Sequence, residues 1–151
     1  MRIGLISDTH GLLRPEALAF LQGCDHIVHA GDIGTPDILA ALAALAPLSA
    51  IRGNVDTGDW AAAVPDTLEL ALGGLRLLVL HDRKQLQRDP GAEGFDVVVS
   101  GHSHRPRIEA RGDVLYVNPG SAGRRRFSLP VTAAELVVAH GKLTPRIVEL
   151  M

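Results

Sequence analysis

Five short polar clusters in the sequence contain residue types that can do chemistry, and each follows an apolar, strand-like stretch. In chain order they are Asp8-Thr9-His10, Gly31-Asp32, Gly53-Asn54-Val55-Asp56, His81-Asp82 and Gly101-His102-Ser103-His104. If those stretches are strands, the clusters lie at carboxyl ends, where open α/β sheets place their ligands. Together they supply carboxylate and amide oxygens and four imidazoles. These donors form a ligand set for two divalent metal ions.

Each cluster taken alone also has an ordinary structural explanation. Asp, Asn and Gly are common turn residues, so turn chemistry accounts equally well for Asp8, Asp32 or Asn54 in isolation. His102 and His104 differ, because two imidazoles beside a glycine have no obvious packing role and neutral His is the commonest metal ligand. Five unrelated turns would not be expected to follow strands in this order. The combination therefore favours a metal centre.

The composition describes an ordinary globular protein. A chain of 151 residues that is 46% hydrophobic and 21% charged can bury a core, so we expect a single domain over 1–151. A net charge of -2 gives no overall attraction to nucleic acid or to an anionic membrane, and any phosphate recognition must be local. The only cysteine, Cys24, cannot form an internal disulfide, and no signal peptide or membrane-spanning run is visible. We expect a cytoplasmic protein.

The first third of the chain has the βαβαβ order that is typical of a parallel sheet. The expected elements are a strand over Arg2 to Ser7, a helix over Pro15 to Gln22, a strand over Asp25 to Ala30, a helix over Asp37 to Ala46 and a strand over Leu48 to Arg52. Thr35 and Pro36 form a strong helix start, and Pro47 stops that helix.

After Pro65 the pattern changes to hairpins. The predicted pairs are Thr67 to Leu72 with Leu75 to Leu80, Arg107 to Ala110 with Val114 to Asn118, and Val131 to Ala139 with Lys142 to Leu150. A short helix near Lys84 to Arg88 and a buried strand over Asp96 to Ser100 lie between the first two pairs. The second half is therefore predicted to be antiparallel, and the whole chain an α/β protein with two stacked sheets and helices outside them.

The order Asp-x-His, Gly-Asp, Gly-Asn-x-Asp, a lone His and Gly-His-x-His resembles the calcineurin-like metallophosphoesterase superfamily. The resemblance covers Arg2 to about Arg124. The small size, Val55 and the stretch Val117-Asn118-Pro119-Gly120-Ser121 look most like small phosphodiesterases of the YfcE type, relatives of the retromer subunit Vps29. This resemblance implies the metallo-dependent phosphatase fold, a four-layer α-β-β-α sandwich of two stacked mixed β-sheets flanked by helices.

Carried over by position, the resemblance also implies the role of each site residue. The implied ligands are Asp8, His10 and His104 for the first metal, Asn54, His81 and His102 for the second, and Asp32 as the bridge between them. Such ligands suit Mn best, with Ni, Fe, Co or Zn as alternatives. Two ions ~3.5–4 Å apart can deprotonate a shared water, so the implied reaction is attack of a metal-bound hydroxide on a phosphodiester. Asp56, also a candidate catalytic residue, either orients an imidazole or caps its turn.

The residue at position 55 distinguishes phosphomonoesterases from phosphodiesterases within the superfamily that the chain resembles. Phosphomonoesterases of the superfamily often carry a His there, which can protonate the leaving oxygen, whereas Val55 has no proton to give. This favours a phosphodiesterase acting on a small substrate. A phosphomonoesterase remains an alternative, as does a Vps29-like protein-binding scaffold. Scaffolding relatives can lose metal-site histidines, whereas every expected position is filled here, so the enzyme is ranked first.

The remaining basic residues match no motif position. His26, His29 and His140 are expected to be structural. The run Arg124-Arg125-Arg126 would ordinarily be a solvated loop, but it follows a turn that lies near the metal cleft in the resembling family. We therefore expect at least one of these arginines to contact substrate phosphate. The apolar hairpin edges near the C-terminus could serve a homo-oligomer or simply finish the sheet.

Overall fold

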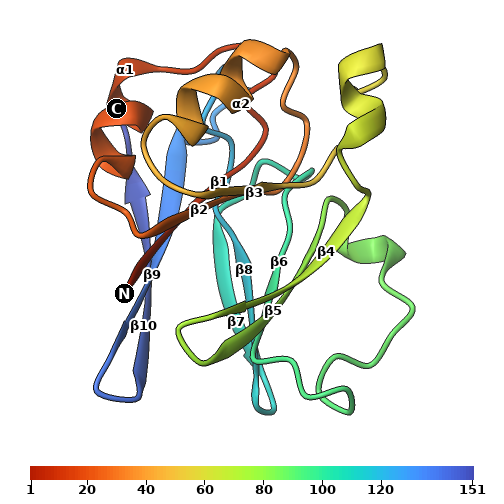
Figure 1. The fold of residues 1–151 in the computed structure, drawn as a ribbon, viewed down its shortest axis with the longest axis vertical. Coiled ribbons are helices and arrows are strands. Elements are labelled where there is room, and N and C mark those ends of the chain that lie inside the picture. Colours follow the sequence, from red (N-terminus) through yellow and green to blue (C-terminus); the bar gives the residue numbers. More distant parts are fainter.

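Ten strands and four short helices make up the computed structural model, which describes residues 1–151 (Figure 1). The strands are β1 (Arg2–Ile6), β2 (His26–His29), β3 (Leu48–Ala50), β4 (Thr67–Leu72), β5 (Leu75–Leu80), β6 (Val97–Val99), β7 (Arg107–Arg111), β8 (Val114–Asn118), β9 (Thr132–Ala139) and β10 (Lys142–Glu149). The helices are α1 (Pro15–Leu21), α2 (Pro36–Ala43) and the 3₁₀ turns η1 (Asp59–Ala63) and η2 (Arg83–Gln85). None of the helices has both the length and the apolar character that crossing a lipid bilayer requires.

The strands form two five-stranded mixed sheets, and the central core lies between them. The strand orders are β10-β9-β1-β2-β3 and β4-β5-β6-β8-β7. Side chains alternate along β1, so Ile3 and Leu5 enter the core shared with Leu77 and Val99 of the second sheet, while Ile6 faces the helices. Figure 1 shows the two sheets facing each other, with α1 and α2 outside the first. The predicted stacked-sheet architecture is confirmed.

The helices on the first sheet each bury apolar residues against it. Leu21 of α1 and Ile38 and Leu42 of α2 pack in a second core cluster against the outer side of β1 and β2. The corresponding layer on the second sheet is the segment 81–96, in which Leu86 and Phe95 cover that sheet's outer face. This layer contains the single turn η2, so the helix predicted near Lys84 to Arg88 is reduced to three residues.

Strand direction in the second half differs from the prediction. The hairpins β4–β5, β7–β8 and β9–β10 are antiparallel as expected. However, β6 pairs in parallel with both β5 and β8, so an entirely antiparallel second half was wrong. The physical reason lies in the connections. Segment 81–96 returns the chain to the end of the sheet where β5 begins, and segment 100–113, which includes β7, returns it there again before β8.

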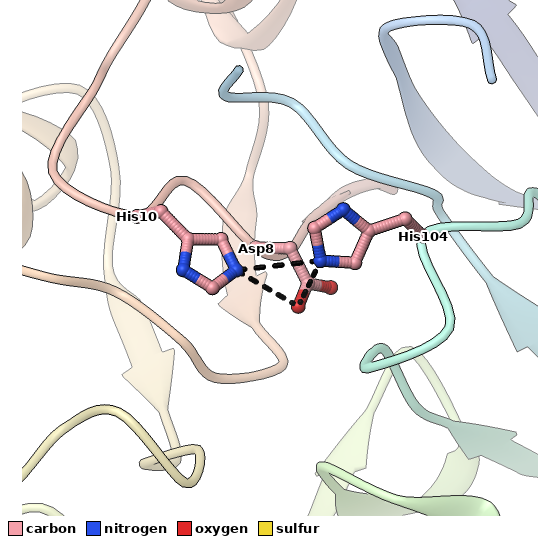
Figure 2. Close-up of side chains that lie close together, drawn as sticks. All are labelled: Asp8, His10 and His104. Carbon is pink, nitrogen blue, oxygen red and sulfur yellow. Dashed lines mark hydrogen bonds and ion pairs between the residues drawn. The ribbon is translucent and has the colours of Figure 1, made fainter. Parts of the chain in front are cut away.

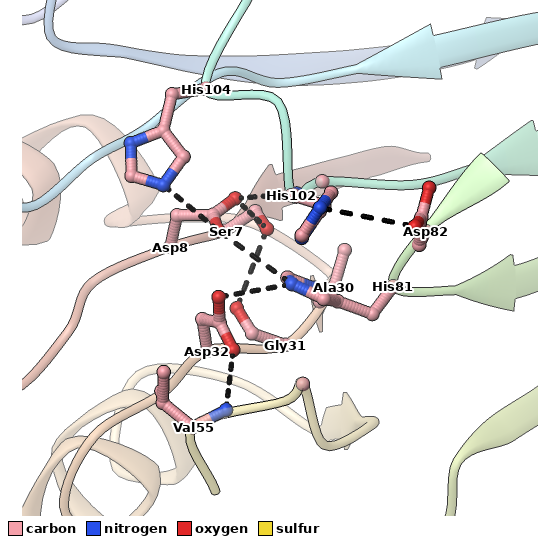
Figure 3. Close-up of polar contacts among 12 residues, drawn as sticks. Ser7, Asp8, Ala30, Gly31, Asp32, Val55, His81, Asp82, His102 and His104 are labelled. Carbon is pink, nitrogen blue, oxygen red and sulfur yellow. Dashed lines mark hydrogen bonds and ion pairs between the residues drawn. The ribbon is translucent and has the colours of Figure 1, made fainter. Parts of the chain in front are cut away.

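This arrangement brings the polar clusters together. In the first sheet β1, β2 and β3 run parallel, and in the second β5 and β6 do. Each of these five strands is followed directly by one of the polar clusters. The carboxyl ends of both sheets therefore meet along one edge of the sandwich, from which the clusters converge (Figure 3).

Candidate metal centre

The first group of candidate ligands consists of Asp8, His10 and His104. Each offers one ligand atom, and the three atoms lie within 4.8 Å of one another. The Nε2 atoms of His10 and His104 are 3.3 Å apart, and Asp8 Oδ1 lies 3.4 Å from His104 Nε2 and 3.7 Å from His10 Nε2. Figure 2 shows these three atoms directed at one another. The predicted first-metal ligands are thus brought together.

The second group consists of Asp32, His81 and His102, with the same separation limit of 4.8 Å. His81 Nε2 lies 3.0 Å from Asp32 Oδ2, and the rings of His81 and His102 meet edge to face at 5.2 Å (Figure 3). Asn54 is exposed and lines the same pocket as His81 and His102. The structure therefore gathers the predicted second-metal residues around one pocket.

The two groups are adjacent, and their carboxylates lie between the imidazoles. Asp32 Oδ2 is 3.5 Å from His10 Nε2 of the first group, and Asp8 Oδ1 is 3.9 Å from His81 Nε2 of the second. Asp32 consequently contacts imidazoles of both groups. This is the place that a bridging carboxylate would occupy.

The tautomer of His81 indicates that the site fits a cation. Nδ1 lies 2.7 Å from the carbonyl oxygen of Ala30, which can only accept, so Nδ1 carries the proton of the neutral ring. Nε2 then presents a lone pair to the Asp32 carboxylate, and this buried atom has no hydrogen-bond partner. Asp8 Oδ1 is likewise buried without a partner. Lone pairs that face one another in a buried site need a cation between them, so these residues fit divalent metal ions.

The remaining contacts hold the carboxylates ionised and oriented. Burial alone would raise the pKa of Asp8, but His10, His104 and the Ser7 hydroxyl hold it well below its ordinary value. Asp8 Oδ2 accepts from Ser7 Oγ at 2.7 Å and from the backbone N–H of His102 at 3.1 Å. These two donors fix one carboxylate oxygen and leave Oδ1 directed into the centre.

Asp32 is held in a comparable way. Burial would raise its pKa, but the His81 imidazole, when it is protonated, and the backbone N–H of Val55 lower it. The Val55 N–H donates to Oδ1 at 3.1 Å and leaves Oδ2 directed at the imidazoles (Figure 3). Both carboxylates therefore remain negative at neutral pH, as cation ligands must.

Backbone strain is concentrated at these residues. Seven residues other than glycine have a positive φ, and five of them are candidate ligands. These five are Asp8 (55°), His10 (46°), Asp32 (55°), His102 (70°) and His104 (62°). Such conformations each cost on the order of 1 kcal/mol for residues with a β-carbon and persist where the surroundings impose them. Their gathering at one place indicates a functional site.

Motif glycines allow the close approach of these loops. A β-carbon at Gly101 would overlap Ser7 Oγ and lie 2.6 Å from Asp8 Oδ2. One at Gly31 would lie 2.7 Å from His81 Nδ1. Gly31 and Gly101, which precede Asp32 and His102, are therefore needed for packing against the neighbouring ligand loop.

Asp56 has the contacts of a loop cap. Its Oδ2 accepts from the backbone N–H groups of Ile33 and Gly53 at 3.0 and 2.9 Å, and its Oδ1 accepts from that of Gly34 at 2.9 Å. None of these partners is an imidazole. Of the two roles expected for Asp56, these contacts favour the cap, which joins the loops that carry Asp32 and Asn54.

We expect Asp56→Ala to lower the free energy of unfolding by about 2–4 kcal/mol, because three backbone N–H groups lose a buried acceptor. Asp56→Asn keeps one acceptor oxygen and should lose less. Urea denaturation measures both, with Asp113→Ala in the exposed β7–β8 turn as the control. Unchanged stability together with lost activity would instead support a direct catalytic role for Asp56.

Two of the three histidines outside the motifs have structural partners. Fully buried His29 accepts from the N–H of Gly31 and lies 3.0 Å from Thr9 Oγ1, and burial lowers its pKa to about 4. His26 pairs with the Ser49 hydroxyl at 2.8 Å. His140 is exposed in the β9–β10 turn. The contacts of His26 and His29 agree with the structural roles predicted for them.

The run Arg124-Arg125-Arg126 is exposed, and no side chain in it forms a hydrogen bond or ion pair. It follows Gly123, whose backbone packs against Thr9, so the run begins beside the loop of the first ligand group. The structure thus places it near the centre without showing a phosphate-binding geometry.

Sequence reasoning missed a second set of basic residues next to the centre. Arg83, Arg105, Arg107 and Arg111 line a pocket that also includes His102. The available signal was the alternation Arg107-x-Glu109-x-Arg111, which puts three charges on one face of a strand. The position of this face beside the metal centre depends on the path of β7, so it could not be predicted from the sequence.

Comparison with known proteins gives consistent results. Residues 1–141 match the calcineurin-like phosphoesterase superfamily domain. A probable metallophosphoesterase of Methanothermobacter thermautotrophicus is 38% identical over 144 residues, which cover 86% of this chain and 82% of that protein. A phosphodiesterase of Methanocaldococcus jannaschii is 26% identical over 138 residues, which cover 80% of this chain and 83% of that protein.

Solved structures share the fold. An archaeal phosphodiesterase superposes with a TM-score of 0.81 at 23% identity, covering 98% of this chain and 100% of that one. Vps29 of Entamoeba histolytica, solved with zinc, gives a TM-score of 0.77 at 17% identity and covers 100% of both chains. At these identities the likeness supports the architecture, and the predicted fold class is confirmed.

Proposed function

The chain belongs to the calcineurin-like phosphoesterase superfamily, and from this premise we propose that it is a two-metal-dependent phosphodiesterase acting in the cytoplasm on a small phosphodiester. The observation that carries the proposal is the pair of adjacent ligand groups, Asp8-His10-His104 and Asp32-His81-His102. Two divalent ions, for which we propose Mn²⁺, would supply an activated water and neutralise charge on the phosphoryl oxygens.

The residues of this chain would hold and orient the reacting groups. Asp8, His10 and His104 would bind one ion, Asn54, His81 and His102 the other, and Asp32 both. The Ala30 carbonyl keeps the His81 proton on Nδ1, so Nε2 is available as a ligand without any proton rearrangement. Ser7 similarly holds Asp8 with one oxygen directed inward. Such fixed ligands lower the cost of reorganisation during the reaction.

The preference for diesters is inferred from position 55. The Val55 backbone N–H supports Asp32, while its side chain is 46% exposed and offers no proton. An enzyme without an acid at this place depends on substrates whose leaving oxygen departs readily. The similarity to a Methanocaldococcus jannaschii phosphodiesterase supports a diesterase, and a phosphomonoesterase is the main alternative.

A protein-binding scaffold is the alternative from another class, because several structural neighbours are Vps29 proteins. A scaffold has no need for buried ligand atoms without partners or for strained ligand residues. The chain has both, at Asp8 and at the residues around it. We therefore rank the enzyme above the scaffold.

The direct test is to strip the protein with chelator, reload it with Mn²⁺ and compare hydrolysis of bis-p-nitrophenyl phosphate with that of p-nitrophenyl phosphate. The two substrates share a leaving group, so the comparison isolates diester from monoester. We expect metal to restore cleavage with a strong preference for the diester. Preference for the monoester would contradict the proposed diesterase and favour the phosphomonoesterase. No turnover with two metals bound per chain would contradict the enzyme and favour the scaffold.

We also propose that at least one arginine of the run Arg124-Arg125-Arg126 contacts the substrate phosphate, because the run begins beside the first ligand group. Single substitutions to Gln should raise the KM for the diester about three- to tenfold with little change in kcat, since a contact made equally in ground and transition states affects KM. Steady-state kinetics of the three variants provide the measurement. Unchanged KM in all three would contradict this contact.

A further inference from the structure

A basic pocket adjoins the second ligand group on the outer face of the second sheet. It has a volume of about 700 Å³ and opens between η2 and the β7–β8 hairpin. Five of its lining residues are lysine or arginine and one, Asp82, is acidic, in a protein whose net charge is -2. Positive charge is thus accumulated locally against the trend of the whole chain, at a pocket of the size that holds a small molecule.

The strand geometry of β7 produces part of this accumulation. Arg107, Glu109 and Arg111 pair with Asn118, Tyr116 and Val114 of β8, and alternate residues share one face of a sheet. That face is the outer one, because Tyr116 and Val114 belong to the outer apolar cluster. The edge strand therefore presents two guanidinium groups to the same pocket.

Glu109 holds these arginines without neutralising them. Its carboxylate lies 2.7 Å from Arg83, 3.0 Å from Arg107 and 3.6 Å from Arg111. Arg83 is also stacked over the ring of Tyr116 at 4.1 Å. One carboxylate among three guanidinium groups leaves an excess of positive charge, and the contacts limit the freedom of the side chains. A cluster held in this way is prepared to receive an anion.

Two further cations of the pocket have no acidic partner at all. Lys84 of η2 and Arg105, next to the ligand His104, line the pocket and form no ion pair. His102 belongs to the second ligand group and lines the same pocket, so the basic surface is continuous with the metal centre. An anion bound there would lie beside the scissile phosphodiester.

We propose that this pocket binds a second phosphate group of the substrate, which makes the preferred substrate a phosphodiester carrying another phosphate about one nucleotide unit away. The proposal rests on the proposed phosphodiesterase function and adds the substrate class to it. Arg105 and Arg107 are the residues assigned to the second phosphate. Arg83 and Arg111, which Glu109 contacts together with Arg107, complete the positive surface around them.

The test compares two substrates with the same scissile bond, the p-nitrophenyl ester of thymidine 5′-phosphate and the same ester with a 3′-phosphate. We expect the 3′-phosphate to raise kcat/KM of the Mn²⁺-loaded protein about tenfold, mainly through KM, and the gain to fall as salt is added. In the double variant Arg105→Gln/Arg107→Gln the gain should shrink to about twofold or less. Arg146→Gln removes one positive charge on β10, outside the residues that line the pocket, and should keep the gain. Equal kcat/KM for both substrates, or a gain retained in the double variant, would overturn the proposed phosphate-binding role of the pocket. Either result would leave the proposed diesterase function standing.

A binding measurement separates this proposal from failure of the enzyme itself. Titration calorimetry of the Mn²⁺-loaded protein with thymidine 3′,5′-bisphosphate and with thymidine 5′-phosphate needs no turnover. About tenfold tighter binding of the bisphosphate, lost in the double variant but kept in Arg146→Gln, supports the pocket even if no ester is cleaved. Equal affinity for the two nucleotides would overturn it. Circular dichroism confirms that the double variant, with both changes at exposed positions, is folded.

Discussion

Replacement of Asp32 by Ala is expected to abolish phosphodiester hydrolysis while the chain stays folded. Asp32 Oδ2 lies 3.0 Å from His81 Nε2 and 3.5 Å from His10 Nε2, so this single carboxylate contacts both ligand groups. Removing it takes away a shared ligand and a negative charge from both proposed ions. Since such ions stabilise the transition state by several kcal/mol, the loss should be about a thousandfold or more.

Two variants make this result interpretable. Ala at a φ of 55° adds strain of about 1 kcal/mol, whereas Asn tolerates this conformation and can still accept from the Val55 N–H. Asp32→Asn should therefore fold as well as the wild type and still lose the bridge. Asp113→Ala removes an exposed carboxylate from the β7–β8 turn and should leave turnover unchanged. The measurements are hydrolysis of bis-p-nitrophenyl phosphate, bound metal per chain and thermal unfolding. Retained turnover in folded Asp32→Ala and Asp32→Asn proteins would rule out the mechanism.

The ligand groups could be predicted because the motifs are tied to strand ends. Asp8 and His104 are far apart in sequence, yet each follows a strand whose carboxyl end faces the same edge of the sandwich. Because the strands are parallel, the clusters that follow them lie at the same edge of the sandwich and come together. The apolar run over Arg2 to Ser7 likewise predicted the strand β1, which spans Arg2–Ile6.

Features that depend on long-range contacts could not be predicted in the same way. The role of Asp56 rests on two N–H groups from the loop after β2, which a sequence pattern does not place. The parallel pairing of β6 follows from where segment 81–96 crosses the sheet, which its polar composition does not reveal. The basic pocket needs Arg83 of η2 to meet Glu109 of β7. In each case the decisive contact joins residues from separate elements, and no local rule specifies it.

Replacement of Val55 by His should give the protein a monoesterase activity that depends on the leaving group. The Val55 side chain is 46% exposed, so an imidazole fits without repacking the core, and the backbone N–H that supports Asp32 is retained. A positioned proton donor accelerates departure of a poor leaving oxygen by about 100-fold or more.

The comparison of two monoesters isolates this effect. Release of phosphate from glycerol 2-phosphate, whose alkoxide leaves poorly, should rise about 10- to 100-fold in Val55→His, because proton donation limits that reaction. Cleavage of p-nitrophenyl phosphate should change little, because its leaving group needs no acid. The new activity should decline as pH rises above about 6.5, where the introduced imidazole loses its proton. Val55→Gln is the matched control, a polar side chain beside the same centre that cannot act as an acid at this pH. An equal rise in phosphate release in both variants would mean that polarity alone is responsible. No rise in phosphate release in Val55→His would mean that the absence of an acid at position 55 does not set the preference for diesters.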